Sequence, residues 1–301
     1  MHTPVLLQAA LEGLQVKKGG LYIDATVGEG GHLTEIVKLG GKVLGIDWDE
    51  KQIQNLILRH PEFNSASKLS FPRKRESKKT TGSPIRSGMT KLVQGNFADI
   101  EKIAKANNFY PVGGVLLDLG LSNEQIQTSG RGFSFHKDSE PLDMRIDSNL
   151  KITAADLVNN FKQTELYEIL AGYSEDINSL AISHAIVRTR AVKKIITVGD
   201  LLKIISEKIG SKDNRTNARI FQALRIAVNH EFDNLKSGLI GALNILKNEG
   251  RIVVISFHSL EDRIVKQFAN KNNLIQINKK VIKGNRDVDY ERSAKLRVLL
   301  K

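Results

Sequence analysis

Short, continuously apolar runs that end in glycine or aspartate recur along the first part of the chain and return near its end. They are rich in Val, Ile and Leu, as strands buried on both faces of a sheet are. The runs are 21–27, 42–47, 91–94, 114–118 and 251–257. The segments between them have helical spacing; Asp49, for example, precedes an apolar stripe of Ile53, Leu56 and Ile57. Strands that alternate with helices predict an α/β fold with a doubly wound parallel sheet.

From about residue 153 to 232 the pattern is helical throughout. The segment 153–156 (TAAD) is a capping box, which marks a helix start. Side chains then recur at helical spacing in three groups: Leu166/Ile169/Leu170, Leu180/Ala181/His184/Ala185 and Ile220/Leu224/Ala227/Val228. A helical block between strands predicts an inserted domain. The expected division is a sheet domain of 1–126 and 218–301 around a helical domain of 127–217, which would recognise the substrate.

The bulk composition is that of a globular protein: 301 residues, 41% hydrophobic and 26% charged. There is no cysteine, so disulfides, thiolate nucleophiles and cysteine-based zinc sites are excluded. No apolar run approaches the roughly 18 residues of a membrane-spanning helix, and the first residues lack the pattern of a signal peptide. A cytoplasmic enzyme without a membrane partner is expected.

The formal net charge is +12, which invites a nucleic-acid partner. However, the segment 64–91 holds eight basic residues and one acid, and so carries +7 of that charge. Its Ser, Lys, Gly and Pro content is typical of a disordered or looped insertion. It is interpreted either as a tolerated surface insertion, which is favoured, or as an arm that grips RNA. Charge alone therefore makes RNA or DNA plausible and no more.

A glycine-rich loop, DATVGEGGH at 24–32, lies between the first expected strand and a helix. Glycines there let the backbone approach a bound nucleoside and turn sharply into the helix. Asp47 ends the second strand 17 residues after Gly30, where a carboxylate can accept hydrogen bonds from both ribose hydroxyls. Because NAD enzymes use the same geometry, the loop alone indicates only a nucleotide cofactor.

Residues at the ends of the third and fourth strands help to decide which nucleotide cofactor the loop binds. Phe97 follows the third strand, where an aromatic ring can cover an adenine, and Asp118 ends the fourth, facing the reactive end of a ligand. The chain has no Tyr-x-x-x-Lys pair and no P-loop motif, which argues against short-chain dehydrogenase and P-loop ATPase chemistry. S-adenosylmethionine is favoured over NAD, with simple solvation of each acid as the alternative.

Seven motifs resemble those of one family in the order in which they occur along the chain. They are HTPVLL (2–7), DATVGEGGH (24–32), LDLGLS (117–122), RGFSF (131–135), PLDMR (141–145), FQALRI (221–226) and SFHSLEDR (256–263). Together they are similar to the 16S ribosomal RNA cytosine N4-methyltransferase family (RsmH, formerly MraW). The chain departs from that family's pattern in the basic insertion, at Ser139-Glu140, and at 289–292 (DYER), where relatives typically have Asn-Pro-Arg-Ala-Arg.

The resemblance implies a class I S-adenosylmethionine-dependent methyltransferase, with a Rossmann-like sheet and an inserted helical domain. Its implied substrate is a cytidine in the decoding region of 16S ribosomal RNA in the small subunit, position 1402 in the family. A homodimer is one assembly left open. The cofactor-binding residues that the resemblance implies are Gly30, Gly31, His32, Asp47, Phe97, Asp118 and Gln125. No metal site is expected.

Methyl transfer to the N4 amine needs an acceptor for its proton, because the amine lone pair is delocalised into the ring. Asp118 and Ser122 are hypothesised to border the transfer position, and His258 is a second candidate to accept or relay the proton. Alternatively, Asp118 only binds the methionine part of the cofactor. The segment 259–262 (SLED) is also a capping box, so the residues around His258 could simply start a helix.

Two further features could contact RNA. Arg131, Phe133 and Phe135 offer a cation and two rings for stacking on an extruded base, or else pack between the domains. The helical block holds four bases that could meet phosphates or simply be solvated: Arg188, Arg190, Lys193 and Lys194. Two other functions stay open, an NAD-linked oxidoreductase and a non-catalytic RNA-binding or ribosome-assembly factor.

Overall fold

The computed structural model describes residues 4–64, 90–210, 213–278, 280–285, 287–288 and 291–301. The chain forms two compact units, a sheet unit of residues 1–120 and 234–301 and a helical unit of residues 121–233. Most of the basic segment 64–91 therefore lies outside the described residues. Its ends do not, because Asn64 closes a short 3-10 helix and Lys91 belongs to a strand.

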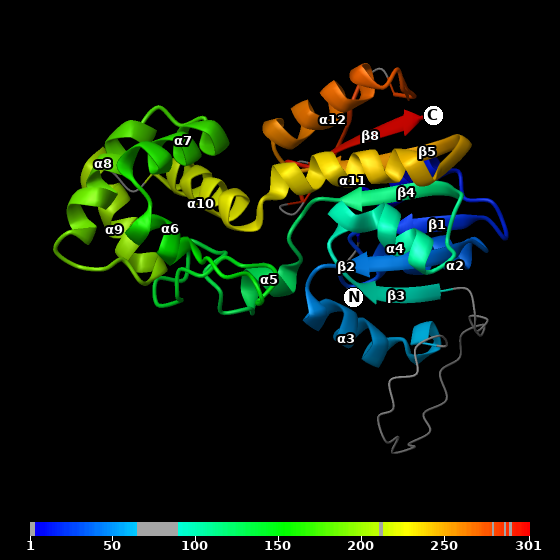
Figure 1. The fold of residues 1–301 in the computed structure, drawn as a ribbon, viewed down its shortest axis with the longest axis horizontal. Coiled ribbons are helices and arrows are strands. Elements are labelled where there is room, and N and C mark those ends of the chain that lie inside the picture. Colours follow the sequence, from blue (N-terminus) through cyan, green and yellow to red (C-terminus); the bar gives the residue numbers. More distant parts are fainter. Residues whose placement is uncertain (1–3, 65–89, 211–212, 279, 286, 289–290) are drawn as a thin grey trace, which may run out of the picture. The chain divides into compact units, whose positions relative to one another are not determined.

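The sheet unit is built on one mixed sheet (Figure 1). Its strands are β1 (Leu21–Asp24), β2 (Lys42–Asp47), β3 (Thr90–Gln94), β4 (Val112–Asp118), β5 (Leu246–Ser256), β6 (Ile275–Gln276), β7 (Ile282–Lys283) and β8 (Lys295–Leu300). The order is β3-β2-β1-β4-β5-β8-β6, with β7 also paired to β8. The first five strands run parallel and β8 runs antiparallel to β5. This confirms the predicted α/β fold of the class I methyltransferase type, but the sheet is not wholly parallel as predicted, because β8 runs antiparallel to its neighbours.

Helices cover both faces of this sheet, as its apolar strands require. They are α1 (Leu7–Leu14), α2 (Gly31–Lys38), α3 (Glu50–Arg59), α4 (Ile100–Ala106), α11 (Glu231–Ile245) and α12 (Ser259–Lys271), with η1 (Pro61–Asn64) and η2 (Phe97–Asp99). Side chains alternate along β5: Val253 belongs to a buried cluster with residues of α1, α2 and α3, whereas Val254 belongs to one with residues of α4, α11 and α12. Both are almost completely buried. Asp49 caps α3 by accepting the Lys51 N–H, as predicted.

The helical unit contains α5 (Asn123–Gln127), α6 (Ala154–Asn160), α7 (Gln163–Ser174), α8 (Ser179–Arg190), α9 (Val198–Ile209) and α10 (Asn214–Asn229). The predicted capping box at Thr153 and Asp156 is present, and Thr197 and Asp200 form another at the start of α9. Leu170 of α7 and Leu224 of α10 are fully buried in a core of this unit's own.

The helix predicted around Leu180–Ala185 is confirmed as α8, but the residues that recur there are not its buried face. Leu180 is half exposed and His184 is exposed, while Ile182 and Ile186 are buried together with two serines. Serine can occupy the buried face because its hydroxyl is satisfied locally: Ser183 Oγ donates to the Leu180 carbonyl at 2.8 Å. The buried face of α8 therefore includes two serines, which a pattern of apolar residues does not mark.

The two units meet in the chain at 120/121 and 233/234, whereas the expected divisions lay at 126/127 and 217/218. Residue 217 lies inside α10, a helix that contacts α7 and belongs to the helical unit. Among the described helices, none is long and apolar enough to cross a membrane.

Candidate functional site

The loop between β1 and α2 has the backbone that its glycines predict. Gly28 and Gly30 have φ values of +47° and +82°, in the left-handed region. A Cβ atom on Gly30 would lie 2.5 Å from Leu56 Cδ1, so the loop is closed on that side. A Cβ on Gly28 would find nothing nearer than the Thr26 carbonyl oxygen, 4.0 Å away. The loop therefore packs tightly at Gly30 and leaves room for a ligand at Gly28.

Asp47 lies at the carboxyl end of β2 and holds this loop. Its Oδ2 accepts the Gly28 N–H at 2.8 Å, and its Oδ1 accepts the Asp49 N–H at 2.9 Å. Burial raises the pKa of Asp47 to about 6, although these hydrogen bonds oppose the rise. A carboxylate has about four acceptor positions, so Asp47 can still accept a hydrogen bond from a ligand hydroxyl.

Asp24 and Asp118 end the adjacent strands β1 and β4. The Asp118 N–H donates to Thr26 Oγ1 at 2.7 Å, which ties the end of β4 to the glycine loop. Burial raises the pKa of both acids to about 7; the negative charge of Asp118 adds to the rise at Asp24, and that of Glu261 to the rise at Asp118. The sequence interpretation missed Asp24 as a site residue, although its place at a strand end is the signal that identified Asp47 and Asp118.

His32, in the first turn of α2, is buried beside Asp118. Its Nε2 lies 3.0 Å from the Val5 carbonyl oxygen and its Nδ1 lies 4.0 Å from Asp118 Oδ2. A carbonyl can only accept a hydrogen bond, so Nε2 carries the hydrogen and Nδ1 presents its lone pair. Burial lowers the pKa of His32 to about 4, which keeps the ring neutral at pH 7. The site thus holds a neutral acceptor next to a carboxyl group.

Phe97 follows β3, the strand that neighbours β2. Its ring packs against α11: a Cβ on Gly238 would lie 2.6 Å from Phe97 Cδ2. The ring is only partly buried. Contact with an adenine stays a prediction for this residue.

Ser122 and Gln125 belong to the helical unit, unlike Asp118. Ser122 Oγ accepts the Gln125 N–H at 3.1 Å, and Gln125 Oε1 accepts the Ser122 N–H at 3.0 Å. This reciprocal pair is a capping box that starts α5. The structure therefore gives both residues a role in local folding, and their roles in catalysis and cofactor binding stay predictions.

His258 follows β5 and is the N-cap of α12, so the capping box predicted at Ser259 and Asp262 is wrong by one residue. The box pairs His258 with Glu261: His258 Nδ1 accepts the Glu261 N–H at 3.4 Å, and Nε2 lies 3.1 Å from Glu261 Oε1. Glu261 Oε2 also accepts the Phe257 N–H at 2.8 Å. An extended backbone at His258 lets the imidazole take the place of the expected serine hydroxyl. Nδ1 is thus engaged by the Glu261 backbone, whereas Nε2 lies close to the Glu261 carboxylate without a hydrogen bond to it.

The sheet unit thus brings together Asp24, His32, Asp47 and Asp118 at the carboxyl ends of its parallel strands, where open α/β sheets bind ligands. In the described part of the chain, no group of three or more His, Cys, Asp or Glu side chains could hold a metal ion. The arrangement can bind hydroxyls, offer acceptors to an N–H donor, and take up a proton near neutral pH.

The RGFSF segment is held within the helical unit. Arg131 Nη1 donates to the carbonyls of Arg145 and Ile146 at 3.0 and 2.7 Å, and its guanidinium carbon lies 5.4 Å from the centre of the Phe133 ring. Phe135 meets Phe221 edge-on, with ring centres 6.0 Å apart. Both phenylalanines are partly buried against the core of this unit. Packing within the helical unit therefore accounts for much of this motif.

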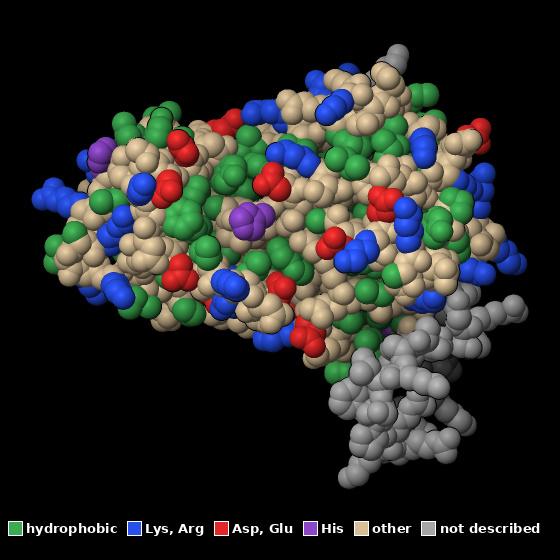
Figure 2. All heavy atoms as spheres, viewed as in Figure 1, with side chains coloured by type: hydrophobic (Ala, Val, Ile, Leu, Met, Phe, Trp, Pro, Cys, Tyr) green, Lys and Arg blue, Asp and Glu red, His purple; other side chains and the backbone are tan. Residues whose placement is uncertain are grey.

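Of the four basic residues predicted to contact RNA phosphates, two bind other groups of this chain and two are exposed to solvent. Arg190 donates to the Val158 carbonyl at 2.7 Å and Lys193 pairs with Asp200 at 2.9 Å, whereas Arg188 and Lys194 are exposed. On the face shown in Figure 2, Lys and Arg side chains of the described residues are interspersed with Asp and Glu. Charge distribution thus adds little to the assignment of an RNA substrate.

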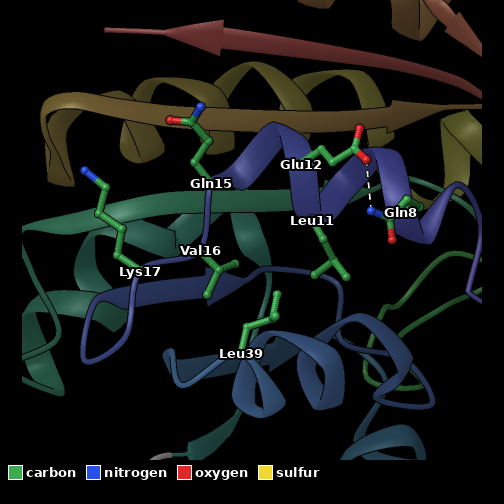
Figure 3. A pocket seen from close by; sticks show the side chains of 7 residues that line it. All are labelled: Gln8, Leu11, Glu12, Gln15, Val16, Lys17 and Leu39. Carbon is green, nitrogen blue, oxygen red and sulfur yellow. Dashed lines mark hydrogen bonds between the residues drawn. The ribbon is translucent and has the colours of Figure 1, made fainter.

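A surface hollow lies away from these residues (Figure 3). It is lined by one side of α1, by the 15–17 segment that precedes β1, and by Leu39, which precedes β2. The last two lie at the amino ends of their strands, the opposite edge from Asp24 and Asp47. Gln8 and Glu12, one turn apart on α1, hydrogen-bond to each other on that side of the hollow at 2.9 Å. The hollow is not part of the candidate site.

Comparison with known proteins agrees with this geometry. A family model described as "MraW methylase family" matches residues 1–299. A ribosomal RNA small subunit methyltransferase H from Symbiobacterium thermophilum is 40% identical over 273 residues, which cover 88% of this chain and 78% of that protein. The protein of the same name from Dictyoglomus thermophilum is 38% identical over 307 residues, covering 99% of this chain and 96% of that protein.

Proposed function

Because the chain belongs to the MraW methylase family, it is a methyltransferase that uses S-adenosylmethionine, and we propose that it methylates the exocyclic N4 of a cytidine in 16S ribosomal RNA. The names of the relatives from Symbiobacterium and Dictyoglomus support ribosomal RNA of the small subunit as the substrate. The atom N4 and the position, cytidine 1402, rest on the seven ordered motifs. Family membership removes the NAD-linked alternative. A ribosomal substrate makes the cytoplasm the proposed location.

One observation carries the chemical part of the proposal: Asp118 lies at a strand end in the site with its pKa raised to about 7. S-adenosylmethionine supplies a methyl group bound to a positively charged sulfur. When the N4–carbon bond forms and the sulfur–carbon bond breaks, the amine must lose a proton. A carboxylate with a pKa near the working pH is suited to accept that proton. Asp118 is therefore the proposed acceptor, and Ser122 the proposed neighbour that orients the amine.

The cofactor is proposed to lie along the carboxyl ends of β1, β2 and β4. Asp47 has lone pairs left for the ribose hydroxyls, and the open space at Gly28 admits the nucleoside. The remaining proposed contacts are Gly30, Gly31, His32, Phe97, Asp118 and Gln125. The acids at these strand ends also favour a cationic ligand, because a nearby positive charge offsets their mutual repulsion.

His258 is the second candidate to accept or relay the proton. Its Nδ1 accepts the Glu261 N–H, which supports a capping role more directly than a catalytic one. Glu261 raises the pKa of Asp118 through its negative charge. A change at His258 that moves Glu261 would therefore alter Asp118 without any direct part for the imidazole.

The test is nucleoside mass spectrometry of 16S ribosomal RNA from cells that lack the gene and carry either the wild-type chain or Asp118→Asn. N4-methylcytidine is expected only with the wild-type chain. Methylation on another atom would overturn the proposed target. No methylation, together with binding of the purified protein to the small subunit, would favour the non-catalytic assembly factor.

A further inference from the structure

The segment Pro4–Leu6, here termed the N-terminal strap, lies over the start of α2. A Cβ atom on Gly31 would be 2.3 Å from Pro4 Cγ, so only glycine at 31 lets the strap come this close. The next residue, Val5, gives its carbonyl oxygen to His32 Nε2 at 3.0 Å. The strap therefore touches the cofactor loop at two consecutive residues of α2.

Leu6 has an unusual backbone for its side chain. Its φ and ψ are 50° and 34°, the left-handed region that leucine rarely occupies, and it forms the N-cap of α1. Such a conformation persists only where the surroundings hold it. The Leu6 N–H donates to Glu291 Oε1 at 3.0 Å, and this bond joins residues 285 positions apart in the sequence.

Glu291 links the strap to the other end of the chain. Its second oxygen, Oε2, accepts the Asn285 N–H at 3.1 Å, so one carboxylate bridges the strap and the connection between β7 and β8. Gly284 lets that connection close: a Cβ there would lie 2.0 Å from the Glu291 carbonyl oxygen. Glu291 belongs to the 289–292 segment, in which this chain departs from the family pattern.

We propose that Glu291 is a positioning residue of the cofactor site, acting through the strap on His32. With the strap in place, the Val5 carbonyl holds the His32 hydrogen on Nε2, and the Nδ1 lone pair faces Asp118 at 4.0 Å. An N–H donor of a bound ligand then finds two acceptors side by side. Without Glu291, the strap leaves, and His32 is free to turn or to exchange its tautomer. The inference rests on the proposed function only in taking S-adenosylmethionine as the ligand of this site.

The experiment compares the full-length wild-type chain with Glu291→Ala, Glu291→Asp and Glu12→Ala. Glu12 is exposed, and within the described residues its side chain hydrogen-bonds to Gln8. Its replacement by alanine removes one negative charge without touching the strap, so this variant controls for the loss of charge. The affinity for S-adenosylmethionine is measured by calorimetry without RNA, and the His32 tautomer by nitrogen-15 NMR. Glu291→Ala is expected to weaken binding roughly fivefold to tenfold, the worth of one to two hydrogen bonds, and to give mixed His32 tautomers.

Glu291→Asp keeps the charge but retracts the carboxylate by one methylene, so a smaller loss of about twofold to fivefold is expected. If the alanine variant does not fold, the aspartate variant decides, since it must still show mixed tautomers. Wild-type affinity and a pure Nε2–H tautomer in the folded Glu291 variants would overturn the proposal, as would an equal loss in Glu12→Ala. Failure of the wild-type chain to bind S-adenosylmethionine would instead refute the cofactor assignment.

Discussion

Three aspartates of the sheet unit and two of the helical unit have pKa values shifted in opposite directions. In the sheet unit, burial raises the pKa values of Asp24, Asp47 and Asp118 to between about 6 and about 7. In the helical unit, hydrogen bonds lower the pKa values of Asp156 and Asp200, from Thr153 in the first case and from Lys193 in the second. The same side chain is thus desolvated at the edge of the sheet and well supplied with donors at the helix starts.

The difference separates acids that stabilise the fold from acids for which a ligand-binding role is proposed. A raised folded-state pKa means that the folded chain holds its proton more tightly than the unfolded chain, so stability falls as pH rises from about 4 towards 7. A lowered pKa has the reverse effect: the stabilisation is present at neutral pH and is lost as the pH falls through the folded-state value. Groups that cost stability at neutral pH are typical of functional sites.

The largest effect is expected for Asp118→Asn. The amide cannot accept the amine proton, so single-turnover methyl transfer should fall roughly 100-fold to 10,000-fold, the usual worth of a general base. At the same time the buried charge disappears, so the melting temperature at about pH 8 should rise relative to the wild-type chain. A variant that is less active but not more stable at high pH would show that the charge of Asp118 is already compensated in the folded chain. A variant with full activity would remove Asp118 as the acceptor.

The next largest effect is a change in the affinity for S-adenosylmethionine with pH. S-adenosylmethionine carries a positive sulfonium, which the ionised forms of Asp47 and Asp118 attract. Their raised pKa values, about 6 and about 7, therefore predict that affinity increases on going from about pH 5 to about pH 8, by on the order of tenfold. Calorimetry in buffers of different ionisation enthalpy should detect proton release on binding at the lower pH. Asp118→Asn should flatten the profile, and an unchanged profile in that variant would assign the dependence to other groups.

A smaller effect is expected for Asp200→Ala in the helical unit. Asp200 Oδ2 accepts the N–H groups of Ile196 and Thr197, both at 3.1 Å, and Oδ1 pairs with Lys193. Losing this helix start should lower the free energy of unfolding by about 1–2 kcal/mol at neutral pH. Because the pKa of Asp200 is depressed, the difference from the wild-type chain should shrink as the solution is acidified. Denaturant unfolding at several pH values measures this, and a difference that grows in acid would contradict the assignment.

The sequence could predict the features of this fold that have local signals, but not those that depend on contacts made in the folded chain. The alternation of strands and helices, the glycine loop and Asp47 and Asp118 at strand ends are local signals, and the structure has them where they were expected. The buried face of α8 was missed because Ser179 and Ser183 satisfy their hydroxyls locally, which no hydrophobicity pattern records. The contact between Leu6 and Glu291 depends on the folded sheet bringing the two chain ends together, so no motif could have indicated it.

The smallest effect is expected at His258, which caps α12 and is also a candidate for proton transfer. If the imidazole only caps α12, Asn, which is among the best N-cap residues, should replace it with little loss, while Ala should lower the free energy of unfolding by about 1 kcal/mol. Single-turnover methyl transfer should stay within roughly threefold of wild type in His258→Asn, since no proton passes through the ring. A loss of roughly 100-fold or more in a stably folded His258→Asn would instead make the imidazole a proton acceptor. In that case the acids at the strand ends, Asp118 included, would serve mainly to bind the cofactor, and the activity of Asp118→Asn at saturating S-adenosylmethionine would recover.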